Sequence, residues 1–105
     1  MLQPHMAENI TPRQALLRDR IAKNLKLFRG KLGMSQELLA DRAGLHRTHV
    51  GLIEKGVTSA RMDTLVALAA ALGVDEMELL VEREEALPPA LKRGRKKKVD
   101  GPAED

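Results

Sequence analysis

Residues 35–56 read SQELLADRAGLHRTHVGLIEKG, and this stretch decides the fold. It contains two short helical patterns on either side of residues 43–45, Ala-Gly-Leu. Ser35 is a suitable N-cap for the first pattern, and Gly44 is a suitable stop for it. The second pattern runs from about Arg47 to Lys55, with Val50 and Ile53 facing inward. Such a sequence is typical of two short helices that cross at a tight turn containing glycine.

The small and apolar positions inside this stretch fit a helix-turn-helix unit. Ala40 is small at the point where the first helix must let the second approach closely. Leu45 and Val50 are apolar where the second helix would pack back on the rest of the domain. In a unit of this kind the second helix lies in the major groove of DNA. The agreement of all these positions therefore favours DNA recognition.

Upstream of this unit, a helix is predicted to begin at residue 11. Thr11 can act as its N-cap, Pro12 suits the first helical position, and Gln14 completes a capping box. The apolar face of this helix consists of Leu17, Ile21, Leu25 and Phe28. Gly30 and Gly33 mark its predicted end.

Downstream, two more helices are predicted. One starts near residues 61–63 and ends at Gly73, a suitable left-handed C-cap. Its apolar residues are Met62, Leu65, Leu68, Ala69 and Leu72. The last helix begins at Asp75, which can form a capping box with Glu78, and it reaches about Ala86. Candidates for its buried side are Met77, Leu80 and Val81. The expected architecture is five short helices without strands.

The composition restricts the class of protein. The chain has 105 residues, enough for one domain, and a domain of this size buries roughly two thirds of its surface. It contains no cysteine, which excludes disulfides, thiolate metal sites and thiol nucleophiles. Its single aromatic residue is Phe28, so aromatic platforms for RNA bases are not expected. No stretch approaches the about 18 apolar residues of a membrane span, and residues 1–10 lack the pattern of a signal peptide. We therefore expect a cytoplasmic protein without membrane contact.

Charge is unevenly distributed along the chain. Residues 11–73 contain 11 Lys and Arg against 5 Asp and Glu, whereas residues 74–91 contain 6 acidic residues and one Arg. A basic body suits a polyanion such as nucleic acid. Residues 92–98, KRGRKKK, could either follow DNA phosphates or remain a solvated tail. The expected parts of the chain are a flexible arm (1–10), one domain (11–86) and a disordered basic tail (87–105).

On these residues the chain resembles the Cro/lambda-repressor-type helix-turn-helix domain, often called the XRE family. The resemblance covers roughly Ile21 to Leu80. The matching residues are Leu25, Phe28, Arg29, residues 33–36, Leu39, Ala40, residues 43–45, Val50, residues 53–56, Leu65, Leu68, Ala69 and residues 71–74. It implies an all-α, compact five-helix DNA-binding domain with the helix-turn-helix at its second and third helices. It also implies a bacterial or phage transcription regulator, a repressor or controller protein that binds a palindromic operator in double-stranded DNA as a homodimer.

The resemblance assigns DNA contacts to particular residues. Gln36 would hydrogen-bond a phosphate, assisted by the free amides at the start of its helix. Arg47 would make a bidentate contact with guanine, and Thr48 would bond a base edge or touch a thymine methyl. His49 is expected to meet backbone or sugar. The full set of expected DNA contacts is Gln36, His46, Arg47, Thr48, His49, Gly51, Leu52, Lys55, Ser59 and Arg61.

Three residues depart from the usual family pattern. His46 stands where the family usually has Ser or Asp as N-cap, so the third helix begins less firmly. Gly51 lies inside the recognition helix, where glycine costs about 1 kcal/mol relative to alanine. It could allow a close approach to DNA or simply be tolerated. Leu52 is apolar at a base-facing position, which suggests contact with a thymine methyl rather than a hydrogen bond.

The resemblance also implies a structural pair and a dimer surface. Arg29 and Glu54 would form a partly buried fork that holds the angle of the reading helix. Many family members dimerise through the fifth helix, which here suggests Met77, Leu80 and Val81, with the fourth helix alongside. These apolar residues could instead only close the core of the monomer.

Other kinds of chemistry find little support in the sequence. His46 and His49 are three residues apart, but no third metal ligand is apparent. No phosphate-binding glycine loop and no arrangement of nucleophile and base is visible. We therefore expect no enzyme activity, cofactor or metal. An alternative function is that of an antitoxin or another protein-interaction module, with the tail as the partner-binding element and autoregulatory DNA binding.

Overall fold

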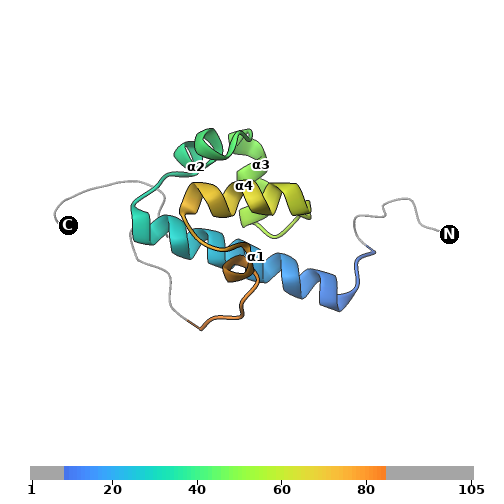
Figure 1. Ribbon diagram of the computed structural model, residues 1–105. Coiled ribbons are helices and arrows are strands. Elements are labelled where there is room, and N and C mark those ends of the chain that lie inside the picture. The colour runs from blue at the N-terminus through green and yellow to red at the C-terminus, as the bar shows by residue number, and fades with distance from the viewer. Residues whose placement is uncertain (1–8, 85–105) are drawn as a thin grey trace.

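The computed structural model describes residues 9–84 as four α-helices and one short 3-10 helix (Figure 1). The α-helices are α1 (Pro12–Leu32), α2 (Gln36–Ala43), α3 (Arg47–Glu54) and α4 (Met62–Leu72), and the 3-10 helix is η2 (Glu76–Leu79). No strand occurs in residues 9–84, so the predicted all-α class is confirmed. The predictions for the basic block and most of both tails lie outside the described residues.

α1 starts at the predicted capping box. The Thr11 hydroxyl accepts a hydrogen bond from the Gln14 amide at 3.0 Å, and the Gln14 side chain accepts one from the Thr11 amide at 2.9 Å. Gly33 is the C-cap and has a φ of 64°, a left-handed conformation that favours glycine. The prediction that Gly30 also marks the end was wrong, because α1 continues through Gly30 to Leu32.

The core lies where the helices meet. In Figure 1, α1 runs along the lower side of the molecule, α2 and α3 lie above it, and α4 lies in front. The largest fully buried apolar side chains come from all five elements and are Leu25, Leu39, Val50, Ile53, Leu68 and Leu79. α3 is thus held to the body by Val50 and Ile53, as predicted. None of the described helices is long and apolar enough to cross a membrane.

The segment after α4 differs from the prediction. η2 has only four residues, and residues 80–84 are not helical, so the α-helix expected from Asp75 to about Ala86 was wrong as far as residue 84, where the described residues end. The Asn24 side chain of α1 donates to the carbonyl oxygens of Leu79 and Val81, both at 2.8 Å. An α-helix would use these same carbonyls for its own amides. The long-range bonds therefore replace the local helical ones.

The buried side of this segment also differs. Leu79 is completely buried, whereas Met77 is 65% exposed and Val81 is 41% exposed. Leu80 is half-buried against the core. In a short 3-10 turn, the residues that face the core do not follow the α-helical spacing on which the prediction rested. Met62, which the sequence placed on the apolar face of α4, is likewise exposed.

Candidate nucleic-acid interface

α3 has one buried face and one exposed face. Val50 and Ile53 point into the core, and the helical period turns their neighbours outward. Arg47, Thr48 and Leu52 are exposed. This arrangement presents a short row of polar, cationic and apolar side chains on a rigid element, which suits the reading of base edges.

The start of α3 has no side-chain cap. His46 occupies the N-cap position, and its side chain makes no capping hydrogen bond, in keeping with the weak start that the sequence predicts. Its backbone carbonyl accepts from the amides of His49 at 3.0 Å and Val50 at 3.2 Å. Among residues 9–84, no group of three or more His, Cys, Asp or Glu side chains could hold a metal ion.

A buried ion pair fixes the end of α3 to α1. Arg29 Nε donates to Glu54 Oε2 at 2.7 Å, and Arg29 Nη2 donates to Glu54 Oε1 at 2.8 Å. Both residues are buried. Arg29 Nη1 also donates to the Met34 carbonyl at 2.9 Å, in the turn between α1 and α2. A bidentate, desolvated pair of this kind sets the orientation of α3 with little freedom.

Gln36 joins this network, a contact that reasoning from the sequence missed. Its Nε2 donates to Glu54 Oε1 at 2.9 Å. Ser35 accepts a bond from the Leu38 amide at 3.0 Å and so caps α2, which places Gln36 in the first turn. The Glu54 carboxylate in the last turn of α3 therefore accepts hydrogen bonds from Arg29 of α1 and from Gln36 in the first turn of α2. No pattern within a single helix indicates this contact, because the two residues are 18 positions apart.

The exposed cations around α3 are not neutralised by acidic side chains of residues 9–84. Arg47, Lys55 and Arg61 are exposed, and none of them forms an ion pair within the described part of the chain. The carboxylate of Glu54 is taken up by Arg29. Positive charge at this surface is therefore available to an external anion.

The predicted DNA-contact residues fall into three adjoining pieces of chain. Those at or in α3 are His46, Arg47, Thr48, His49, Gly51, Leu52 and Lys55. Gln36 is beside them in α2, held to Glu54. Ser59 and Arg61 belong to the loop that leads into α4, where Arg61 is the N-cap, and both are exposed.

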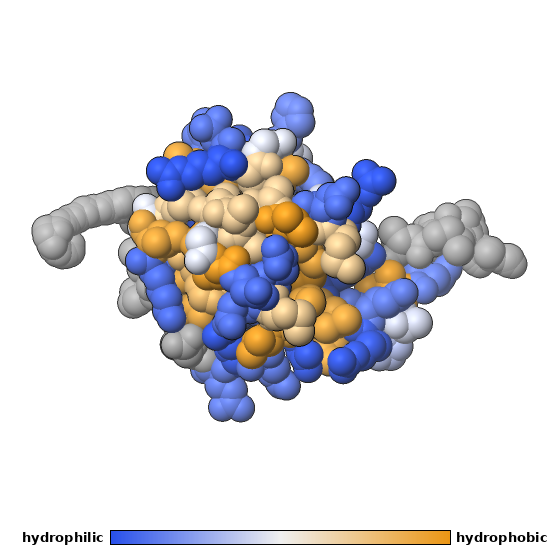
Figure 2. All heavy atoms as spheres, viewed as in Figure 1, coloured by the Kyte–Doolittle hydropathy of each residue, from blue (hydrophilic) through white to orange (hydrophobic). Residues whose placement is uncertain are grey.

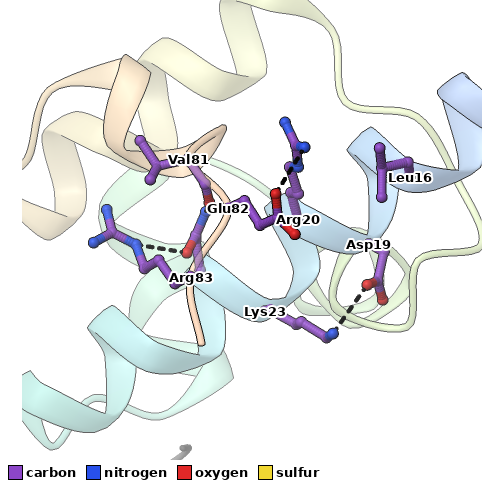
Figure 3. A pocket seen from close by; sticks show the side chains of 8 residues that line it. Leu16, Asp19, Arg20, Lys23, Val81, Glu82 and Arg83 are labelled. Carbon is purple, nitrogen blue, oxygen red and sulfur yellow. Dashed lines mark hydrogen bonds and ion pairs between the residues drawn. The ribbon is translucent and has the colours of Figure 1, made fainter. Parts of the chain in front are cut away.

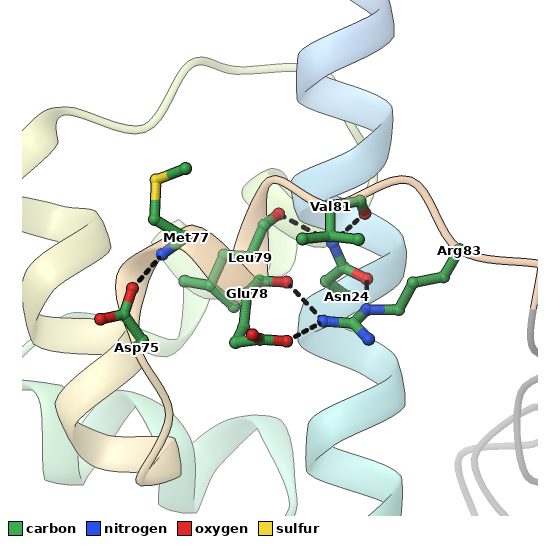
Figure 4. A network of polar contacts seen from close by, with 7 residues as sticks. All are labelled: Asn24, Asp75, Met77, Glu78, Leu79, Val81 and Arg83. Carbon is green, nitrogen blue, oxygen red and sulfur yellow. Dashed lines mark hydrogen bonds and ion pairs between the residues drawn. The ribbon is translucent and has the colours of Figure 1, made fainter.

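The three residues suggested for a dimer surface do not share one exposed face. Met77 points away from α1 (Figure 4). Val81 instead lines a pocket of about 120 Å³ with Leu16 and Arg20 of α1 (Figure 3). A pocket of this size is far below the usual volume of a ligand site. Leu80 is half-buried in the core. Met77 and Val81 are both exposed, and the dimer surface at these residues stays a prediction.

A different apolar surface lies over α4. Figure 2 shows apolar side chains gathered on the face of the molecule where α4 lies in front. Exposed apolar residues of α4 and η2 are Met62, Val66 and Met77. Met62 and Val66 are four residues apart and so lie on the same side of α4. The sequence had placed the fourth helix alongside the suggested dimer surface, but it counted Met62 among the apolar residues of the inward face.

A network of hydrogen bonds centred on Asn24 joins α1 to residues 79–83 (Figure 4). Besides its bonds to the Leu79 and Val81 carbonyls, the buried Asn24 accepts a bond from Arg83 Nε at 2.8 Å. Arg83 also lies over the Phe28 ring at 4.9 Å. The signal in the sequence was a polar residue at position 24, next to Leu25 on the buried face of the helix.

Comparison with known proteins points in the same direction. The helix-turn-helix family model matches residues 25–79. A protein of Neisseria meningitidis serogroup B, named as a hypothetical transcription factor, is 40% identical over 76 residues, 72% of each chain. Control protein C.SmaI of Serratia marcescens is 34% identical over 67 residues, 64% of this chain and 80% of that protein. The crystal structure of the restriction-modification controller protein C.AhdI from Aeromonas hydrophila aligns with a TM-score of 0.58 at 34% identity, over 59% of this chain and 94% of that one.

Proposed function

Because the chain belongs to the XRE-type helix-turn-helix family of DNA-binding transcription regulators, we propose that it is a homodimeric regulator that reads a palindromic operator in the major groove with α3. The observation that carries the proposal is that one face of α3 is fixed to the body of the domain while the opposite face is exposed. Arg29 and Glu54 hold α3 to the body, and Arg47 stands exposed and unpaired by the described residues. The similarity to control proteins of restriction-modification systems favours a small regulator of the controller type.

In this proposal, base reading belongs to the exposed side of α3. Arg47 makes a bidentate contact with the O6 and N7 atoms of a guanine. Thr48 bonds a base edge or touches a thymine methyl, and Leu52 packs against a thymine methyl. All three side chains are exposed on one rigid helix, which supports their assignment.

Contacts to the DNA backbone come from the flanks of α3. The amide nitrogen of Gln36 carries two hydrogens, and its bond to Glu54 uses one of them, which leaves the other for a phosphate oxygen. Lys55, Ser59 and Arg61 are exposed beyond α3 and would meet phosphates. The remaining backbone contacts are assigned to His46 and His49.

The dimer contact is proposed on the exposed side of α4 together with Met77, one of the three residues first suggested. Met62, Val66 and Met77 are exposed apolar side chains, and apolar surface of this kind is typical of protein interfaces. A homodimer related by a two-fold axis places two copies of α3 on successive turns of DNA. This geometry accounts for a palindromic site.

The proposal is tested by selecting bound duplexes from a random pool with the full chain, at two salt concentrations. We expect enrichment of a palindrome whose half-sites are about 34 Å apart, one turn of DNA. Sedimentation of the complex with the selected duplex should give two chains per site. Binding without enrichment that disappears as salt rises would contradict the proposal and would indicate non-specific contact with phosphates.

Replacement of Arg47 by alanine should weaken operator binding by about 1–3 kcal/mol and relax the preference at one base pair per half-site, because a bidentate guanine contact is lost. The measurement is a titration of the selected duplex and of its single-base variants. Arg13→Ala is the matched control, since it removes the same charge from an exposed position at the start of α1. Equal effects of the two substitutions would show that Arg47 contributes only general charge.

A further inference from the structure

Gly51 lies in the interior of α3, at a position that is poor for glycine. α3 has only eight residues, and a glycine inside so short a helix lowers its stability relative to alanine. The helix already starts without a side-chain cap at His46. The glycine therefore adds to the instability of an element whose orientation the rest of the fold fixes firmly.

The described residues 9–84 give no reason for this glycine. The backbone of Gly51 is helical, unlike that of the four glycines with positive φ, Gly33, Gly44, Gly56 and Gly73. Apart from its chain neighbours and the backbone of α3 itself, a Cβ atom built on Gly51 would meet only Gln36 Oε1, at 3.8 Å, among the described atoms within 4 Å, and this is an ordinary van der Waals contact. Neither backbone conformation nor packing within residues 9–84 excludes an alanine here.

The position of Gly51 relates it to the exposed side of α3. It follows Arg47 by four residues and Thr48 by three, so it shares their side of the helix. Its next residue, Leu52, is exposed. The atom that glycine lacks would therefore project beside the side chains proposed to read the bases.

We infer that Gly51 is a specificity-determining residue that lets the α3 backbone lie directly against a base-pair edge or sugar in the major groove. The inference rests on the proposed function and deepens it. Glycine is the residue that allows a backbone to approach a ligand this closely. With the backbone seated at this depth, Arg47 and Thr48 reach their bases, and a side chain at position 51 would lift α3 away from them.

The test is Gly51→Ala in the full chain, measured by thermal unfolding and by titration of two duplexes. Tm should rise by roughly 3–6 °C, because alanine favours the helix. Affinity for the selected operator should fall about tenfold, comparable to the loss of one base contact. Affinity for a random duplex should not change, since the substitution removes no charge. A variant that is more stable and yet reads its operator less well is the expected signature.

Two results would overturn the inference alone. The first is a higher Tm with unchanged operator affinity and unchanged sequence preference, which would mean that the glycine is merely tolerated. The second is a lower Tm, which would mean that the fold itself needs the glycine. If the wild-type chain selects no sequence from the random pool, the proposed function fails first and the inference fails with it, so the two failures are distinguishable.

Discussion

Glu54→Ala is expected to lower the free energy of unfolding by about 3–5 kcal/mol, because it leaves the Arg29 guanidinium buried without its carboxylate. Both side chains are buried, and two hydrogen bonds of 2.7 and 2.8 Å join them. Gln36 loses its partner in the same substitution. The measurement is denaturant unfolding at neutral pH, followed by circular dichroism.

The cost should come from the orphaned charge rather than from loss of a favourable pair. Removing both charges together, as in Arg29→Met with Glu54→Leu, should therefore destabilise the domain much less than Glu54→Ala alone. Operator affinity should nevertheless be lower in the double variant than in the wild-type chain, because no Arg29–Glu54 pair then sets the angle of α3. A loss below about 1 kcal/mol for Glu54→Ala would contradict this account and would place the pair in the range of exposed ion pairs.

Asn24→Ala is expected to lower the free energy of unfolding by about 2–4 kcal/mol, since it leaves the buried Leu79 carbonyl and the partly buried Val81 carbonyl without this donor. Asn24 is buried and bonds the carbonyls of Leu79 and Val81 at 2.8 Å each. It also accepts from Arg83, which then has to find another partner. Thermal and denaturant unfolding measure the loss.

Lys23→Ala is the control for the Asn24 substitution. Lys23 is exposed and next to Asn24 on α1, and its salt bridge to Asp19 is a surface pair, so the change should stay within about 0.5 kcal/mol. Equal stabilities of the Lys23 and Asn24 variants would show that water replaces the side chain amide at both carbonyls.

Asn24→Ala and Glu54→Ala should differ in their effect on operator affinity. Asn24 holds the segment after η2 to α1 and contacts no residue of α3 in its hydrogen bonds. Its loss should reduce stability while folded protein still binds the operator. Loss of Glu54 affects α3 directly and should reduce both the free energy of unfolding and the operator affinity. DNA titrations at a temperature where each variant is folded distinguish these outcomes.

Local rules predicted most of the helices. The capping box at Thr11 and the cap at Ser35 both act over three residues of chain, and the left-handed glycines Gly33, Gly44 and Gly73 end their helices by local backbone geometry. Such interactions are encoded in neighbouring residues and are therefore visible in the sequence alone. The periodic burial of Val50 and Ile53 follows from the helical repeat for the same reason.

Apart from the helix end expected at Gly30, the failures concern contacts between distant parts of the chain. The expected fifth α-helix is a 3-10 turn because Asn24 binds carbonyls 55 and 57 positions away. Gln36 bonds a carboxylate of another helix, and Met62 lies outside the core on the exposed face of α4. None of these contacts leaves a local pattern.

By itself, the sequence determined the family, the all-α class, the boundaries of most helices and the buried face of α3. The tertiary structure alone decided how residues 79–83 are held to α1, which apolar residues remain exposed, and that Gln36 shares the carboxylate of Glu54 with Arg29. The physical reason is the separation along the sequence of the residues that interact. Caps and helical periods depend on residues within about four positions, whereas burial and long-range hydrogen bonds depend on which helices come to lie side by side.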